Sequence, residues 1–184
     1  MRQRPMGGQH PQVGIRPRLR RWAVAATMLA AAGTMVPAGA SRVAHAAPVP
    51  ECMTGVLHAT IGATQHGAGS VFTTLVLRNV GHAACFVQGY PGVSLVGSTG
   101  RQIGRAATRT PATVKRVVLR SGQAASTVIH TLNPDVGTAK CLALSAAVRV
   151  YPPDQRTSLR VKARLSECLG LLEVRPLVAG TAGM

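Results

Sequence analysis

The chain has 184 residues, of which 46% are hydrophobic but only 3% aromatic, and it carries 21 basic against five acidic residues, a formal net charge of +16. So few aromatic side chains argue against a nucleic-acid binder that stacks bases among its basic residues. So few acids argue against a glycosidase with paired carboxylates.

The first 46 residues have the layout of a cleavable secretory signal. Residues 1–21 carry six arginines and no acid, Trp22–Val36 is an apolar run of 15 residues, and Ala44-His45-Ala46 places small residues before Ala47. We predict cleavage near Ala46-Ala47 and a location outside the cell or in the cell wall. An uncleaved anchor is the alternative, although the run is shorter than the ~18–20 residues a span needs. Arg20-Arg21 leaves general secretion and twin-arginine export both open.

Removing this signal peptide (1–46) changes both size and charge. Residues 47–184 retain fourteen basic and five acidic residues, a net charge of +9. About 138 residues make one domain that can bury roughly two-thirds of its unfolded surface. We expect a short N-terminal tail at 47–54, a domain over 52–178 and a flexible tail at 179–184, with no transmembrane segment after cleavage.

Alternating apolar residues then predict strands along the whole domain. Leu57, Ala59 and Ile61 mark the first, and Val71–Arg78 form the second after a turn at His66–Ser70. Further strands are expected at 85–88, 93–95, 114–119, 126–131, 142–151 and 157–166. Strands this closely spaced, without a long amphipathic helix, predict an all-β fold, an antiparallel immunoglobulin-like β-sandwich.

Gly89-Tyr90-Pro91-Gly92 indicates a corner between two strands. Pro91-Gly92 fits a type II turn, in which proline presets φ and glycine accepts a positive φ. We expect the Tyr90 ring to be packed and its hydroxyl to be bonded to backbone. A recognition loop is the alternative.

Four cysteines in an exported domain favour two disulfides. If strand 55–62 pairs antiparallel with the next long strand, Cys52 at its start meets Cys85 beyond the end of the other. The same reasoning joins Cys141 and Cys168, which flank strands 142–151 and 157–166. A metal or reactive-thiol site is the alternative, but no Cys-x-x-Cys is present.

Several of these features together resemble a secreted bacterial family, domain of unknown function 4232. The residues concerned are Leu75-Val76-Leu77-Arg78-Asn79, Cys85, Gly89-Tyr90-Pro91-Gly92-Val93, Ile103-Gly104, Val117-Val118-Leu119, Ser121-Gly122-Gln123-Ala124 and the other three cysteines. The likeness covers residues 52–175 and implies a β-sandwich with no assigned activity. Many relatives carry a lipid-modified cysteine after the leader, but Val49-Pro50-Glu51 before Cys52 is not a lipobox, which argues against a lipid anchor.

The alternation also predicts a basic stripe. If Leu159 and Val161 face the core, then Arg160, Lys162 and Arg164 face water, with Arg149 beside them on the preceding strand. Such a stripe could bind anionic envelope polymers, acidic proteins or phosphate-bearing ligands. The alternative is a solvated face that keeps the sheet soluble and blocks edge pairing.

No motif indicates catalysis or a metal. The four histidines after the predicted leader (His58, His66, His82 and His130) lack zinc-motif spacing, and there is no Gly-x-Ser-x-Gly elbow. We therefore expect no enzyme activity, no metal and no cofactor. The sequence favours a secreted binding module whose partner is an anionic envelope polymer or another secreted protein, and not nucleic acid. A purely structural domain and an envelope hydrolase are the alternatives.

Overall fold

The structure, a computed structural model, describes residues 47–134 and 140–183. The predicted signal peptide, residues 1–46, lies outside this part of the chain. The described residues form twelve strands and one short 3₁₀ turn, η1 (Thr54–Val56). None of their helices is long and apolar enough to cross a membrane. The prediction of an all-β fold is confirmed.

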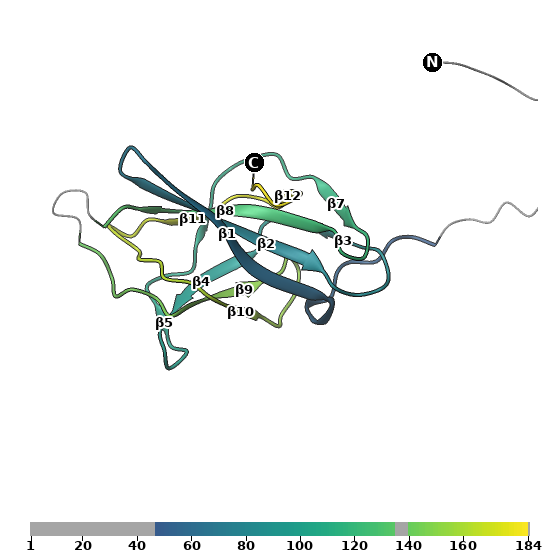
Figure 1. Cartoon of the computed structure of the whole chain (residues 1–184), viewed down its shortest axis with the longest axis horizontal. Helices are drawn as coiled ribbons and strands as arrows, with labels where there is room; N and C mark the ends of the chain where they lie inside the picture. Colours follow the sequence, from purple (N-terminus) through teal and green to yellow (C-terminus); the bar gives the residue numbers. More distant parts are fainter. Residues whose placement is uncertain (1–46, 135–139, 184) are drawn as a thin grey trace, which may run out of the picture. The chain divides into compact units, whose positions relative to one another are not determined.

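The larger sheet forms the upper layer in Figure 1. Its strands follow the order β1-β2-β8-β11-β6, and β12 pairs with β8 beside β11. Neighbours are antiparallel except β6 and β11, which run parallel. The bounds are β1 (Leu57–Gly67), β2 (Ser70–Asn79), β6 (Thr108–Arg109), β8 (Ala124–Leu132), β11 (Leu172–Val174) and β12 (Val178–Ala179).

The smaller sheet lies below it, and a two-stranded ribbon lies at one end (Figure 1). The smaller sheet has the order β10-β9-β4-β5, and the ribbon pairs β3 with β7. Their bounds are β3 (Cys85–Gln88), β4 (Gly92–Val96), β5 (Gln102–Ile103), β7 (Arg116–Leu119), β9 (Ala147–Tyr151) and β10 (Leu159–Lys162).

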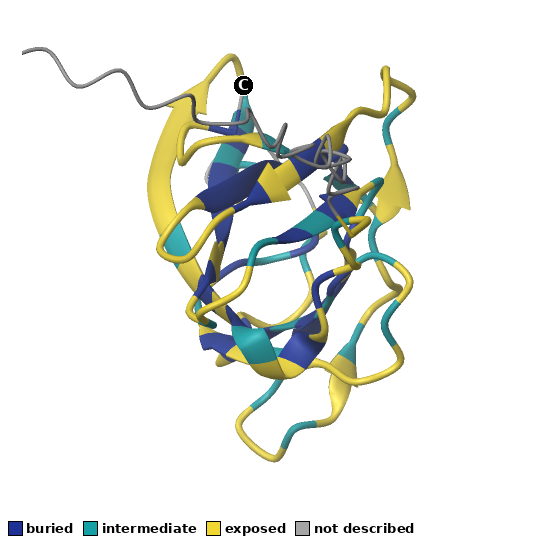
Figure 2. Cartoon of the chain, turned by 90° about the vertical axis from the view of Figure 1, so that its right-hand side faces the viewer, coloured by how far each residue is buried: buried dark blue, intermediate teal, exposed yellow. Residues whose placement is uncertain are grey.

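One hydrophobic core joins the two sheets. Leu75 and Leu77 of β2 point into it from one side, and Leu95 of β4 with Val148 and Val150 of β9 from the other, all at 0% exposure. Figure 2 shows the buried residues on the inner strands and the exposed ones on the loops and outer edges. In β3 and β7 buried and more exposed residues alternate, because successive side chains point to opposite faces, whereas β4 and β8 are buried along most of their length.

The turn predicted at His66–Ser70 is a tight hairpin. Gly67 pairs with Ser70, and the two residues between them, Ala68 and Gly69, have φ angles of 47° and 77°. Positive φ at both central positions is the geometry of a type I′ turn, whose twist matches that of the flanking strands.

The last two predicted strands, 142–151 and 157–166, are shorter in the structure, where β9 begins at Ala147 and β10 ends at Lys162. Beyond the ends of these two strands, the Ser145 side chain bonds to the backbone that follows β10. Its hydroxyl donates to the Ala163 carbonyl at 2.8 Å and accepts from the Leu165 amide at 3.0 Å. A side chain that bonds backbone in this way competes with strand pairing.

The type II turn predicted at Pro91-Gly92 is wrong. Gly92 lies in β4 opposite Tyr151 of β9, and the positive φ, 104°, belongs to Gly89. A Cβ on Gly92 would come within 3.3 Å of the Tyr151 Cβ. Glycine is therefore needed at position 92 for a close approach of two strands, whereas the chain turns at Gly89.

Tyr90 has the packing and bonding that the sequence predicts for it. Its ring lies against the core cluster, and its hydroxyl donates to the Thr110 carbonyl at 3.0 Å and accepts from the Ala112 amide at 3.1 Å. The Arg109 guanidinium lies 5.5 Å from the ring centroid. Tyr90 thus holds the 110–112 segment against the domain.

We expect Tyr90→Phe to lower the free energy of unfolding by about 1 kcal/mol, because the change removes one hydroxyl that serves two backbone groups at a half-exposed site. Urea unfolding followed by far-UV circular dichroism would measure it. Arg109→Ala is the control, since it removes only the cation above the ring, a contact of about 0.5–1 kcal/mol at an exposed site. Equal stability of Tyr90→Phe and the parent would contradict the assigned role of the hydroxyl.

Both predicted disulfides are present. Cys52 is bonded to Cys85 and Cys141 to Cys168, and the described residues include no free cysteine. The antiparallel pairings behind the prediction, β1 with β2 and β9 with β10, are also present. The bonds lie beyond the ends of these pairs: Cys85 begins β3, and Cys141 and Cys168 face each other in an isolated antiparallel bridge.

The segment expected to be a flexible tail, 179–184, makes several backbone contacts as far as residue 183. Ala179 pairs with Ala125, the Gly180 amide donates to Ala124, and the Gly183 amide donates to the Ser126 hydroxyl at 2.8 Å. Because β12 extends the ladder on β8, the chain end is held to the larger sheet.

The N-terminal tail predicted at 47–54 is likewise attached. The Cys52 amide donates to the Phe86 carbonyl at 2.8 Å, and the Phe86 amide donates to Pro50 at 2.9 Å. Arg116 donates from Nη2 to the Val49 carbonyl at 2.9 Å. Both ends of the described domain are therefore bonded to strands.

Candidate functional site

Three of the four predicted stripe residues share the outer face of the smaller sheet. Arg149 of β9 lies directly opposite Arg160 of β10, and Lys162 is the next outward residue on β10. Val161 between them is 9% exposed and packs into the core. The predicted strand phase is therefore correct. We call Arg149, Arg160 and Lys162 the basic face.

Two of these cations also hold the turn between β4 and β5. Arg149 Nη2 donates to the Gly100 carbonyl at 2.7 Å, and Arg160 Nη2 donates to the Gly97 carbonyl at 3.2 Å. Because these partners are neutral carbonyl groups, they do not compensate the positive charges of Arg149 and Arg160. Between described residues, the one contact of a basic side chain with a carboxylate joins His130 and Glu173, so no such contact neutralises the basic face.

A hollow of about 410 Å³ opens on this face. Arg160, Lys162 and Ser98 border it together with Ala146 and Ala147. Ala147 is 1% exposed and its side chain is small, which leaves room above the sheet between the longer side chains. Two cations and a hydroxyl around a small apolar patch are groups that can attract an anion and donate hydrogen bonds to it.

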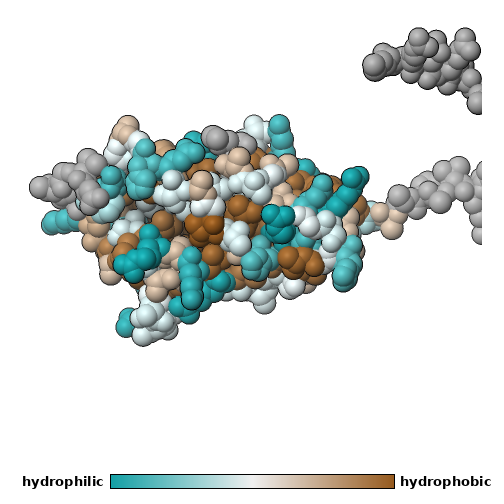
Figure 3. Space-filling model, viewed as in Figure 1, coloured by the Kyte–Doolittle hydropathy of each residue, from teal (hydrophilic) through white to brown (hydrophobic). Residues whose placement is uncertain are grey.

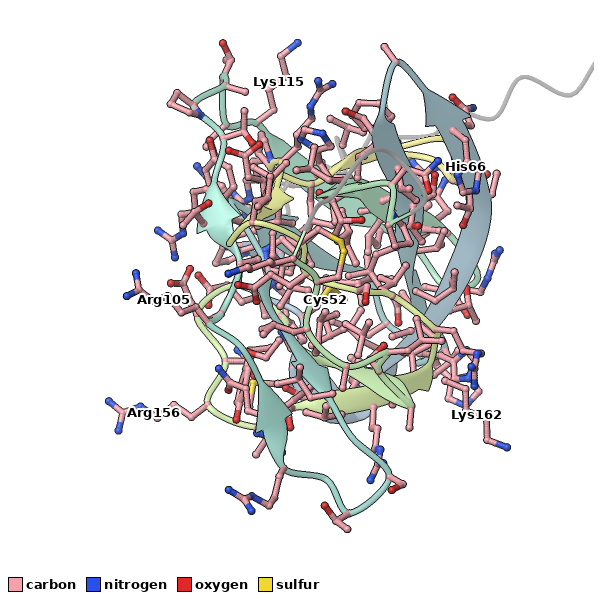
Figure 4. All side chains as sticks on the ribbon, turned by 90° about the vertical axis from the view of Figure 1, so that its left-hand side faces the viewer. Cys52, His66, Arg105, Lys115, Arg156 and Lys162 are labelled. Carbon is pink, nitrogen blue, oxygen red and sulfur yellow. A yellow bond between two sulfur atoms is a disulfide. The ribbon has the colours of Figure 1, made fainter. Side chains whose placement is uncertain are left out.

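Other cations lie on separate parts of the domain. Figure 4 shows Lys162 pointing outward on one side, with Arg105, Arg156 and Lys115 projecting elsewhere. Figure 3 shows hydrophilic and hydrophobic residues interspersed over the face it displays. The excess positive charge is thus spread over the domain, and on the basic face two of the cations, Arg160 and Lys162, border the same hollow.

Arg164 does not belong to this face. It lies beyond the end of β10 and borders a different hollow, together with His66, Thr131 and Leu144. The strand ends at Lys162 because Ser145 bonds the backbone at 163 and 165. The basic face therefore contains three of the four residues predicted for the stripe, and the prediction is corrected for Arg164.

The structure also brings together three residues that no sequence motif connects. Ser70 of β2, His130 of β8 and Glu173 of β11 meet on the outward face of the larger sheet. Their separations in sequence, 60 and 43 residues, hide the arrangement from any local motif. Among the described residues, no group of three or more His, Cys, Asp or Glu could hold a metal ion.

Comparison with known proteins gives one family. The family model described as Domain of unknown function (DUF4232) matches residues 52–178. A search of curated proteins finds no match.

Three solved structures of β-glucosidases show a distant likeness to this chain. A selenomethionine-labelled β-glucosidase from Kluyveromyces marxianus has a TM-score of 0.29 at 12% identity, covering 61% of this chain and 14% of the enzyme. A β-glucosidase from Listeria innocua in complex with isofagomine also has 0.29 at 12% identity, with 58% and 16% covered. The Kluyveromyces marxianus enzyme in complex with glucose has 0.30 at 14% identity, with 61% and 15% covered. This chain thus spans about a seventh of those enzymes, and such scores carry no argument about fold or function.

Proposed function

The chain belongs to the family Domain of unknown function (DUF4232), and from this premise we propose that it is a secreted, non-enzymatic binding module that holds anionic polymers of the cell envelope at its basic face. The hollow bordered by Ser98, Arg160 and Lys162 is the observation that carries the proposal. The predicted leader supports an extracellular location, and two disulfides are compatible with one.

A polymer suits this face better than a single small ion. Exposed charges attract weakly in water and are screened over about 8–10 Å at physiological salt, so one pair contributes little. Outward residues repeat about every 6.6–6.8 Å along a strand, which lets Arg160 and Lys162 contact successive charges of a repeating polyanion. Once one charge of a polymer is bound, its neighbours are held at a high effective concentration near the face, so several weak contacts together give a higher affinity.

We expect the double variant Arg160→Glu/Lys162→Glu to bind isolated cell walls and soluble polyphosphate at least about 10-fold more weakly at low salt. Each reversal replaces an attraction with a repulsion, and ~1.4 kcal/mol in total already gives a factor of ten. Co-sedimentation with the walls and fluorescence titration with polyphosphate, from about 50 to 300 mM salt, would measure the loss.

The matched control is Arg105→Glu/Lys115→Glu, which changes the net charge equally but at exposed positions away from the hollow (Figure 4). It should keep most of the binding. If both double variants lose binding alike, the effect is one of net charge and the basic face is not the site. If the parent protein ignores both probes at low salt, the face serves solubility alone and a purely structural role is favoured.

A further inference from the structure

Ser70, His130 and Glu173 form a hydrogen-bonded relay on the larger sheet. Ser70 Oγ lies 3.1 Å from His130 Nε2, and Glu173 Oε2 lies 3.1 Å from His130 Nδ1. The three residues come from the neighbouring strands β2, β8 and β11. The carboxylate and the hydroxyl therefore bond opposite nitrogens of one imidazole ring.

The strands and one aromatic ring hold the imidazole in place. His130 is the cross-strand partner of both Phe72 on β2 and Glu173 on β11. The Phe72 ring stacks on the imidazole with centroids 4.6 Å apart and planes 13° from parallel. His130 is thus positioned by stacking on its face and by a carboxylate at its edge, before any ligand is present.

This order of contacts selects one tautomer of the neutral ring. A carboxylate accepts a hydrogen bond from Nδ1–H, and the Nε2 lone pair is then directed at the serine hydroxyl. A nucleophile, a base and an orienting acid in hydrogen-bond contact are the elements of serine activation, and they are recognised by geometry and role, whatever the fold.

We propose that Ser70 is a nucleophile that accepts an acyl group from small activated esters, with His130 as its general base and Glu173 as the positioning residue. Ser70 Oγ attacks the ester carbonyl while its proton passes to His130 Nε2. The bond between the carbonyl carbon and the alkoxy oxygen breaks, and the proton passes on to that oxygen. The products are an ester of Ser70 and a free alcohol.

The surroundings of Ser70 limit the reaction to small substrates. Ser70 is half-buried at the start of β2, beside the Ala68-Gly69 turn, and His130 and Glu173 are 25% and 31% exposed. A small ester can reach such a site from solvent, but an open sheet face offers little to bind or orient a large one. We expect one acyl group per chain with slow release, which is compatible with a binding role at the basic face of the other sheet.

The test uses the purified, oxidised chain with p-nitrophenyl acetate and, separately, a fluorophosphonate probe. We expect one added group on Ser70, located by peptide mass spectrometry, and none in Ser70→Ala. Positioned general bases contribute about 10²–10⁴-fold, so His130→Gln should slow the labelling of Ser70 about 100-fold. Ser121→Ala, which removes an exposed turn serine elsewhere, should label as the parent does.

The variant Glu173→Gln distinguishes a role of Glu173 in orienting the His130 ring from a role in stabilising the fold alone. It should slow the labelling about 10-fold and shift or remove the NMR resonance of the His130 Nδ1 proton, while leaving the circular dichroism spectrum of the fold unchanged. Labelling spread over several serines and lysines, or Ser70 labelling at the same rate in folded His130→Gln, would overturn the proposal. Polymer binding at the basic face is measured separately, so either proposal can fail alone.

Discussion

Replacing Cys52 and Cys85 together with alanine is expected to lower the free energy of unfolding by about 3–5 kcal/mol. The bond joins residues 33 positions apart, and a cross-link over a loop of this size removes about 4 kcal/mol of chain entropy from the unfolded state in the loop-closure model. Cys52 and Cys85 are 2% and 5% exposed, so the alanines also leave apolar space unfilled. Guanidinium unfolding of the oxidised proteins, followed by far-UV circular dichroism, would measure the difference.

The second disulfide provides the comparison. Cys141 and Cys168 are 27 positions apart, and the same model assigns their bond a similar contribution. The first bond ties Cys52, in the segment before β1, to β3, so its loss should also expose the amide hydrogens of Cys52 and Phe86 to exchange. A double variant as stable as the parent, with those amides still protected, would show that the strands alone hold this corner.

Replacing Asn79 with leucine is expected to cost about 2–5 kcal/mol. Asn79 is 0% exposed at the end of β2, and its side chain makes three hydrogen bonds of 2.9 Å. Nδ2 donates to the carbonyls of Ala83 and Leu119, and Oδ1 accepts from the Gly81 amide. Leucine is of similar size but supplies neither donor nor acceptor. The Leu119 carbonyl, whose bond is buried, would be left unpaired at a cost of about 1–3 kcal/mol, and the partly buried partners at Ala83 and Gly81 add to this cost.

His58→Ala is the matched control for this change. His58 is an exposed residue of β1 that pairs with Arg78, next to Asn79, so its loss should shift stability by no more than about 0.5 kcal/mol. Thermal and urea unfolding of both variants would separate the two cases. A loss below about 1 kcal/mol for Asn79→Leu would mean that water or a local shift satisfies the three backbone groups.

The backbone contacts of Asn79 give a structural reason for the asparagine in the Leu75–Asn79 motif, which is part of the family resemblance. Its backbone amide donates to Gln123, and its carbonyl accepts from Gly122, so one residue joins the end of β2 to the turn before β8. The side chain adds the β2–β3 loop and β7 to the same junction. A structural requirement thus accounts for this asparagine without any ligand.

Neighbouring antiparallel strands were predictable from the sequence because their signals are local. Alternation marks β1, β2, β9 and β10, and β-branched residues mark β8. Short turns such as Ala68-Gly69 make neighbours in sequence into neighbours in space. The disulfide pairs followed from that pairing alone. The phase of β10, and with it the outward direction of Arg160 and Lys162, followed from the same period of two.

Short strands and remote contacts were not predictable in this way. β5, β6 and β12 have two residues each, too few for any period, and they exist because longer strands offer them unpaired edges. Gly92 carries a turn signal but lies in a strand, because the ladder with β9 outweighs its local preference. Arg164 leaves the basic face because a serine 19 positions earlier bonds its backbone neighbours.

The sequence by itself determined the all-β class, the longer strands and the cysteine pairs, since each depends on residues close in sequence or on strands that follow one another. Only the tertiary structure decided what meets on the outer faces. Ser70, His130 and Glu173 come into contact because β8 lies between β2 and β11 in the sheet, an order that chain-wide packing sets. The hollow beside Arg160 and Lys162 likewise depends on the β4–β5 turn at 97–100, which supplies Ser98 to its border and accepts hydrogen bonds from Arg149 and Arg160.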